Sequence, residues 1–164
     1  MKIGWIGLIV LFFISSLILT GFWFYSEGPA NIIDPKMTEI EIDELYGPFI
    51  PIYFGELQLR ASVADTESER QQGLSGTPVL PTGIVKLFIF ESPAVWGFWM
   101  KGMNYPIDII WLDADKKIIH VAANLAPETY PTSFLPPVDS LYVIETPAGQ
   151  AEREQMVVGA KFTW

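Results

Sequence analysis

The sequence predicts a mainly β domain that lies outside a membrane, behind one amino-terminal transmembrane helix. Three observations lead to this class. Residues 3–25 contain no charged side chain. Several later segments alternate apolar and polar positions, as half-buried strands do. Helix signals are confined to short stretches such as 66–73. Once the apolar segment is set aside, the rest of the 164 residues is enough for one domain with a real core.

Residues 1–25 are predicted to form a transmembrane anchor. A hydrocarbon core about 30 Å thick needs about 20 apolar helical residues, whereas a signal-peptide core has about 7 to 15. Trp5 and Trp23 suit the two membrane interfaces, and Lys2 places the amino terminus in the cytoplasm. We therefore expect a single-pass membrane protein with its domain outside. The Gly-Pro-Ala stretch at 28–30 keeps a cleaved signal peptide, and a secreted or periplasmic domain, as the alternative.

Residues 26–51 are predicted to be an acidic, proline-containing linker. The range holds six Asp or Glu residues against Lys36 alone, together with four prolines. Because like charges repel and prolines stiffen the chain, this segment should hold the domain away from the lipid surface. Within it, residues 35–45 suit a short helix, while the alternation of Ile40 and Ile42 suits an extended strand. Both alternatives stay open.

The globular domain is predicted to span residues 52–164. Segments 57–63, 84–90, 118–122 and 141–145 have the patterns of strands. Residues 125–137 hold four prolines and predict a long ordered loop. A segment at 157–164 is expected to close the domain and to be able to form an edge strand.

Two short helices are predicted in this domain. Thr66-Glu-Ser-Glu69 has the form of a capping box, in which the first and last side chains bond each other's backbone N–H groups. Gly73 lies where a glycine would end the helix, and Arg70 lies within it. The second helix is expected over residues 148–155.

The stretch 96–113 combines aromatic residues, a lysine and an aspartate around a proline turn, and we interpret it as a hairpin. Alternation places Trp99 and Lys101 on one face, and it places Asp108 on an apolar side of the returning strand. An unpaired carboxylate there would be costly. The hairpin register therefore predicts that Lys101 and Asp108 pair across the Gly102 to Ile107 loop.

Several of these segments carry motifs in a characteristic order. They are Arg70-Gln-Gln-Gly-Leu74, Phe98-Trp-Met-Lys101, Pro106-Ile-Asp-Ile-Ile110 and Val143-Ile-Glu145. Their order and spacing resemble the DUF192 family, also called UPF0127, over roughly residues 57–162. The chain departs from the family at Gly102-Met103, where Asn-Thr is usual, and near 75–77, where a Met and an Arg are usual. The resemblance implies a compact, β-dominated α+β domain, often secreted or membrane-anchored, in a family with no established activity. We therefore expect an antiparallel-rich sheet or barrel with two short helices.

Composition excludes several functions. A net charge of -9 argues against nucleic acid as a partner, because phosphate binding needs clustered Lys and Arg. The absence of cysteine excludes a disulfide framework and a thiol nucleophile. No metal site and no cofactor are predicted, since His120 is the one histidine and no glycine-rich nucleotide motif is present.

Three function classes remain. The first is a binding or accessory module for a small polar or carbohydrate ligand or an envelope partner. The second is a hydrolase-type enzyme using Lys101, Asp108 and Glu145, although no catalytic residue is assigned. The third is a purely structural interaction domain.

The predicted ligand site is a pocket walled by Trp99 and floored by Lys101 and Asp108, with Arg70 and Glu145 as further polar groups. In the alternative without a ligand, Arg70 and Glu145 neutralise each other while Trp99 fills the core.

Overall fold

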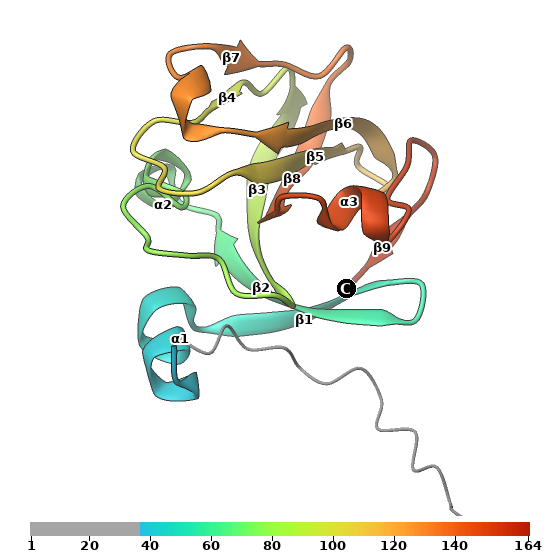
Figure 1. Cartoon of the computed structure of the whole chain (residues 1–164). Coiled ribbons are helices and arrows are strands. Elements are labelled where there is room, and N and C mark those ends of the chain that lie inside the picture. The colour runs from blue at the N-terminus through green and yellow to red at the C-terminus, as the bar shows by residue number, and fades with distance from the viewer. Residues whose placement is uncertain (1–36) are drawn as a thin grey trace, which may run out of the picture.

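The structure is a computed structural model that describes residues 37–164. Within this range, seven strands form one strongly curved sheet (Figure 1). In order across the sheet they are β6 (Ile118–Leu125), β5 (Ile107–Leu112), β8 (Ser140–Pro147), β3 (Ile84–Ala94), β2 (Leu57–Ala64), β1 (Phe49–Phe54) and β9 (Phe162–Thr163). Neighbouring strands are antiparallel except β2 and β3, which are parallel. The prediction of a β-dominated, antiparallel-rich domain is confirmed.

Short helices and a small second sheet complete the described part of the chain. The helices are α1 (Glu39–Tyr46), α2 (Glu67–Gln72), α3 (Gln150–Arg153) and the 3-10 helix η1 (Pro127–Thr129). The second sheet pairs β4 (Phe98–Trp99) with β7 (Ser133–Phe134). β4 and β7 lie at the end of the domain opposite α1 (Figure 1). No helix within residues 37–164 is long and apolar enough to cross a membrane, and the predicted anchor, residues 1–25, lies outside the described residues.

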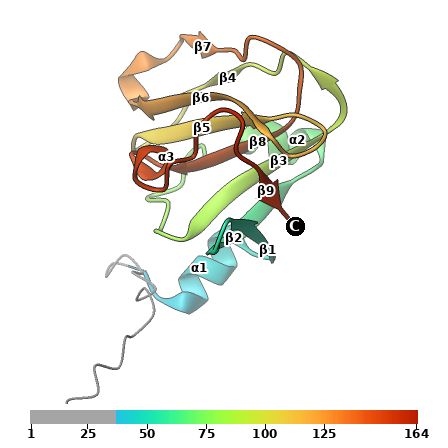
Figure 2. The same ribbon diagram turned by 90° about the vertical axis from the view of Figure 1, so that its right-hand side faces the viewer.

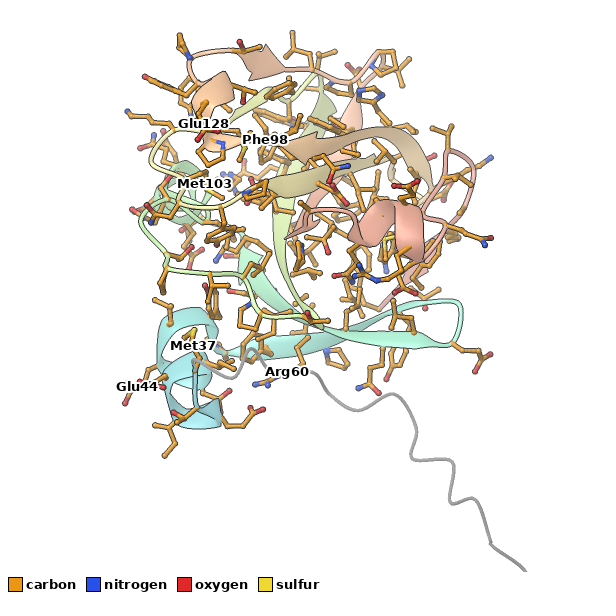
Figure 3. The ribbon with its side chains drawn as sticks, in the orientation of Figure 1. Met37, Glu44, Arg60, Phe98, Met103 and Glu128 are labelled. Atoms are coloured by element: carbon orange, nitrogen blue, oxygen red, sulfur yellow. The ribbon has the colours of Figure 1, made fainter. Side chains whose placement is uncertain are left out.

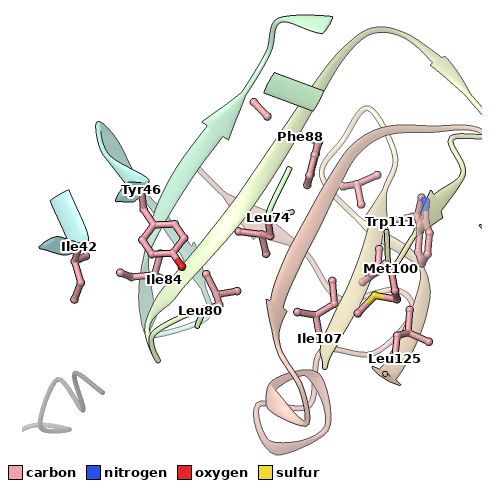
Figure 4. Close-up of a cluster of buried hydrophobic side chains, with 13 residues drawn as sticks. Ile42, Tyr46, Leu74, Leu80, Ile84, Phe88, Met100, Ile107, Trp111 and Leu125 are labelled. Atoms are coloured by element: carbon pink, nitrogen blue, oxygen red, sulfur yellow. The ribbon is translucent and has the colours of Figure 1, made fainter. Parts of the chain in front are cut away.

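The sheet buries apolar side chains on both faces, because alternate residues of a strand point to opposite sides. On the first face, Phe88 and Trp111 pack with Leu74, which follows α2; Figure 4 shows this first core. On the second face, Leu87 and Ile110 form a second core with residues that include Ala151 of α3. Consistent with this division, α2 and α3 lie on opposite sides of the domain in Figure 2.

The predicted linker is wrong from residue 37 onward. α1 is a capped helix whose Ile42 and Tyr46 are buried in the first core, and β1 begins at Phe49. Burial of these two side chains explains why a strongly acidic segment folds against the domain. Arg60 of β2 adds ion pairs to the acidic face of α1. The remainder of the predicted linker, residues 26–36, lies outside the described residues.

The predicted central hairpin is also wrong. β4 pairs with β7, and β5 instead runs between β6 and β8, where all six of its residues are buried. The segment before β4 is held over the sheet by a different contact, in which the Trp111 indole N–H donates to the Trp96 carbonyl at 2.8 Å. The segment 96–103 therefore arches over the first face of the sheet and leaves space beneath it.

Candidate functional site

A cleft of about 620 Å³ opens between α2, the arching segment 96–103 and the first face of the sheet. Its walls are apolar and largely aromatic, formed by Leu74, Phe88, Phe90, Trp96, Phe98, Trp99 and Met103. Figure 3 shows Phe98 and Met103 on the side of the domain where α2 lies. Small-molecule sites have volumes of about 300 to 1,000 Å³ and combine such walls with a few placed polar groups. The charged residues of this cleft therefore decide what it can do.

One wall of the cleft is shaped by the end of α2. The Thr66 side chain accepts from the Glu69 backbone N–H while the Glu69 carboxylate accepts from that of Thr66, so the predicted capping box is confirmed. Gly73 ends the helix with φ 50° and ψ -124°, a conformation that side chains strongly disfavour. A Cβ at this position would lie 3.3 Å from the Phe88 ring and 3.9 Å from Glu145 Oε2. Glycine here keeps the space over Glu145 open.

Glu145 of β8 forms the polar floor of the cleft. Its side chain is only 5% exposed, and its Oε2 has no hydrogen-bond partner among the described residues. Burial raises the pKa of this carboxyl to about 8, and the charge of Lys86 partly opposes the rise. Buried polar atoms without a partner are rare in folded proteins, and each one calls for an explanation.

Lys86 forms no ion pair with the Glu145 carboxyl among the described residues. The two residues are opposite each other across β3 and β8, but the Lys86 ammonium donates to Ser62 Oγ at 3.1 Å and to the Val63 carbonyl at 3.5 Å. Burial lowers the pKa of Lys86, while the carboxylates of Glu69 and Glu145 act in the opposite direction. The lysine is thus directed toward β2, and the Glu145 carboxyl keeps free hydrogen-bonding capacity on the cleft side.

Arg70 lies at the edge of the cleft in a fixed position. Its Nη1 donates to the backbone carbonyls of Asp65 and Ile89, the latter at 3.0 Å, and its guanidinium carbon lies 5.4 Å from the centre of the Phe90 ring. The Phe90 ring in turn stacks on Trp96, with ring centres 4.1 Å apart. No ion pair joins Arg70 to Glu145 among residues 37–164, so the hypothesis that the two neutralise each other is wrong.

The side chains of Lys101 and Trp99 lie at the mouth of the cleft. Trp99 is 55% exposed, so it does not fill the core. The Lys101 ammonium lies 6.0 Å from the centre of the Trp99 ring and forms no ion pair within the described part of the chain. Together with Arg70 and Glu145, these are four of the five residues predicted for the ligand site, and all four line the same cleft.

Asp108 lies elsewhere, and its predicted pairing with Lys101 is wrong. Its carboxylate accepts three backbone N–H groups, from Asn124 at 2.7 Å, Gly149 at 3.1 Å and Ala151 at 2.9 Å. It is completely buried. In the β5 to β8 register Asp108 is opposite Thr146, one residue after Glu145, so the two carboxyl groups point to opposite faces of the sheet. Asp108 fixes the start of α3 and is not part of the cleft.

Sequence reasoning did not identify Gly73, Phe90 or Trp96 as parts of this site. A signal for Gly73 was present, since a helix-ending glycine is expected in a left-handed conformation, but its proximity to β8 depends on the tertiary fold. Phe90 and Trp96 belong to segments read as strand and hairpin, so their stacking could not be seen. Among residues 37–164, no group of three or more His, Asp or Glu side chains is placed to hold a metal ion.

Fold and site together define a curved-sheet α+β domain with an aromatic cleft on one face and a structural carboxylate on the other. Residues 53–164 match the model of the DUF192 family, described as "Uncharacterized ACR", and the chain belongs to that family. A UPF0127 protein of Thermococcus sibiricus is 27% identical over 105 residues, which cover 64% of this chain and 66% of that relative. The chain thus spans slightly less than two thirds of that relative's length.

Two solved structures share the fold. A protein of unknown function from Novosphingobium aromaticivorans DSM 12444 is 28% identical, with a TM-score of 0.67 over 71% of this chain and 85% of its own. A Sinorhizobium meliloti 1021 protein, named for a proposed role as a transcription regulator, is 22% identical, with a TM-score of 0.64 over 69% of this chain and 89% of its own. The second likeness concerns the fold alone.

Proposed function

We propose that the chain is a membrane-anchored, extracytoplasmic binding module whose cleft takes a small polar ligand. The observation that carries the proposal is the Glu145 carboxyl, which is buried at the floor of an aromatic cleft and has an oxygen without a hydrogen-bond partner in the described part of the chain. A ligand hydroxyl or amine at this oxygen would supply the missing hydrogen bond. Arg70, Lys101 and Trp99 then act at the edge and mouth of the cleft, where ligands are oriented.

The hydrolase alternative is weakened by the position of Asp108. Hydrolysis by a pair of carboxyl groups requires both to reach one substrate from within the same site. Asp108 and Glu145 point to opposite faces of the sheet, and the oxygens of Asp108 are occupied by backbone N–H groups. A binding role needs no second carboxylate, so it accounts for the cleft more simply.

A ligand screen followed by NMR on the full-length protein in detergent tests the binding role. Wild type is compared with Glu145→Gln and Trp99→Ala, and the matched controls are Glu56→Gln and Tyr53→Ala, whose exposed side chains do not line the cleft. We expect ligands that shift cleft resonances to bind the controls normally and both cleft variants at least about tenfold more weakly. Equal binding by all five proteins would eliminate this site, and no binding by any would favour a structural interaction domain.

Anchoring is a separate part of the proposal, supported by the uncharged span of residues 3–25. A carboxyl-terminal tag should fractionate with membranes and be open to protease from outside the cell. A mature soluble protein that begins after Ala30 would show that the segment is a cleaved signal peptide instead.

A further inference from the structure

The charged residues around the cleft indicate more about the ligand than the volume of the cleft does. The charged residues that line it are Glu67, Arg70, Lys101 and Glu145. Since burial raises the pKa of Glu145 to about 8, this carboxyl is mostly neutral at pH 7. The remaining three charges give an excess of one positive charge, in a chain whose net charge is -9. The cleft thus holds two cations, Arg70 and Lys101, that form no ion pair among the described residues of an acidic protein.

Arg70 is arranged as an anion-binding group. Two backbone carbonyls hold its Nη1, so the guanidinium is already ordered and loses little entropy when its free N–H groups bind a ligand. No carboxylate pairs with it among the described residues. A neighbouring hollow shares Arg70 and Glu67 with the cleft, and it is also lined by Asp65 and Glu91, whose charges would repel an anion. An anionic group is therefore directed to the cleft side, toward Lys101.

The interior of the cleft suits hydroxyl groups and a ring. A neutral carboxyl both donates and accepts hydrogen bonds, as a hydroxyl does. A second buried group without a hydrogen-bond partner among the described residues is the Trp96 indole N–H, and Trp96 lines both the cleft and the neighbouring hollow. An amine is less suitable, because Arg70 and Lys101 would repel its positive charge. The exposed ring of Trp99 offers a stacking surface at the mouth.

We infer that the ligand is a hydroxylated carboxylate of the sugar-acid class, with its carboxylate toward Arg70 and Lys101 and a hydroxyl at Glu145. This inference rests on the proposed binding function and specifies its ligand. The inference requires that the protein bind a sugar acid more tightly than the parent sugar that lacks the carboxylate. It also requires that the preference depend on the cations of the cleft and weaken with salt.

The test compares hexuronates, the parent hexoses and the corresponding hexosamines for binding to the full-length protein in detergent, by calorimetry and NMR at neutral pH. We expect the hexuronates to bind about tenfold or more tightly than the hexoses, and the hexosamines to bind most weakly. Lys101→Gln should reduce the acid preference about fivefold, because the lysine is exposed and its substitution should leave the fold intact. The matched control, Lys161→Gln, removes an exposed lysine outside the cleft and should leave the preference unchanged.

The outcomes separate the two proposals. Tighter binding of hexoses or hexosamines, or an acid preference unaffected by Lys101→Gln and by salt, overturns the sugar-acid inference. The binding function then stands, provided that Glu145→Gln weakens the ligand that does bind. If no sugar binds but another screened ligand shifts the cleft resonances, the inference falls and the binding function stands. If nothing shifts these resonances, both fall.

Discussion

The Glu145 carboxyl should make the stability of the domain fall as the pH rises through the neutral range. Its pKa is raised from 4.5 to about 8 by burial. Between these values the folded protein holds a proton that the unfolded chain releases, so rising pH favours unfolding. The contribution is fully present below about pH 4.5 and is lost as the pH rises through about 8. The shift corresponds to at most about 5 kcal/mol of unfolding free energy, at about 1.4 kcal/mol per pH unit.

Glu145→Gln isolates this effect, because glutamine keeps the shape and polarity of the protonated side chain but does not ionise. Urea unfolding followed by tryptophan fluorescence, with the full-length chain in one detergent, gives the unfolding free energy at each pH between about 5 and 8. We expect the wild type to lose several kcal/mol relative to Glu145→Gln across this range. Glu41 and Glu69 have lowered pKa values, so the stability that they contribute is lost as the pH falls, the opposite of the effect of Glu145. Their effect lies at pH values more acidic than this range. The reasoning is refuted if wild type and Glu145→Gln have parallel pH profiles, while Glu56→Gln should follow the wild type.

Two further substitutions test the two faces of the sheet. Asp108→Asn should lower the unfolding free energy by about 2 to 4 kcal/mol, because at least one of three buried N–H donors loses its acceptor. Asp115→Asn is the control, because Asp115 is exposed and its side chain forms no hydrogen bond or ion pair among the described residues. Equal stability of the two variants in urea unfolding would contradict the assignment. Gly73→Ala should cost about 1 to 3 kcal/mol through its positive φ and should weaken cleft binding by crowding Phe88, whereas unchanged affinity would show that the cleft does not extend over Glu145.

Local patterns in the sequence predicted local structure well. The strand predicted at 57–63 was visible from its alternation, the strand predicted at 84–90 from its run of β-favouring apolar residues, and the helix between Thr66 and Gly73 from its capping box. These signals lie within a few residues of one another, so no tertiary information was needed. Segment 35–45 was ambiguous because it suits a short helix while its alternating isoleucines suit an extended strand, and packing of Ile42 and Tyr46 into the first core decides for the helix α1.

Pairings between distant segments could not be read in the same way. β4 pairs with β7, which lies about 35 positions further along the chain in the proline-rich segment 125–137, and no periodicity specifies that partner. The sequence predicted correctly that Asp108 needs a hydrogen-bonding partner. The predicted partner was a lysine, whereas three backbone N–H groups donate to its carboxylate. A pattern of charged residues gives no information about backbone N–H donors, because almost every residue has one. Four of the five residues predicted for the ligand site nevertheless line one cleft, and three of them were chosen because charged groups beside apolar elements are costly and therefore informative. Their role in binding stays a prediction.

The two buried carboxyl groups of the sheet support different conclusions about function. Asp108 has all the bonds that a structural carboxylate needs, and its removal should damage the fold. Glu145 is nearly as buried, yet within residues 37–164 its Oε2 gains no hydrogen bond, and burial raises its pKa to about 8. An unsatisfied buried group costs about 1 to 3 kcal/mol, so it weakens the fold it belongs to. Departures of this kind are expected at functional sites. Glu145, rather than Asp108, is therefore the carboxyl group around which a ligand should be sought.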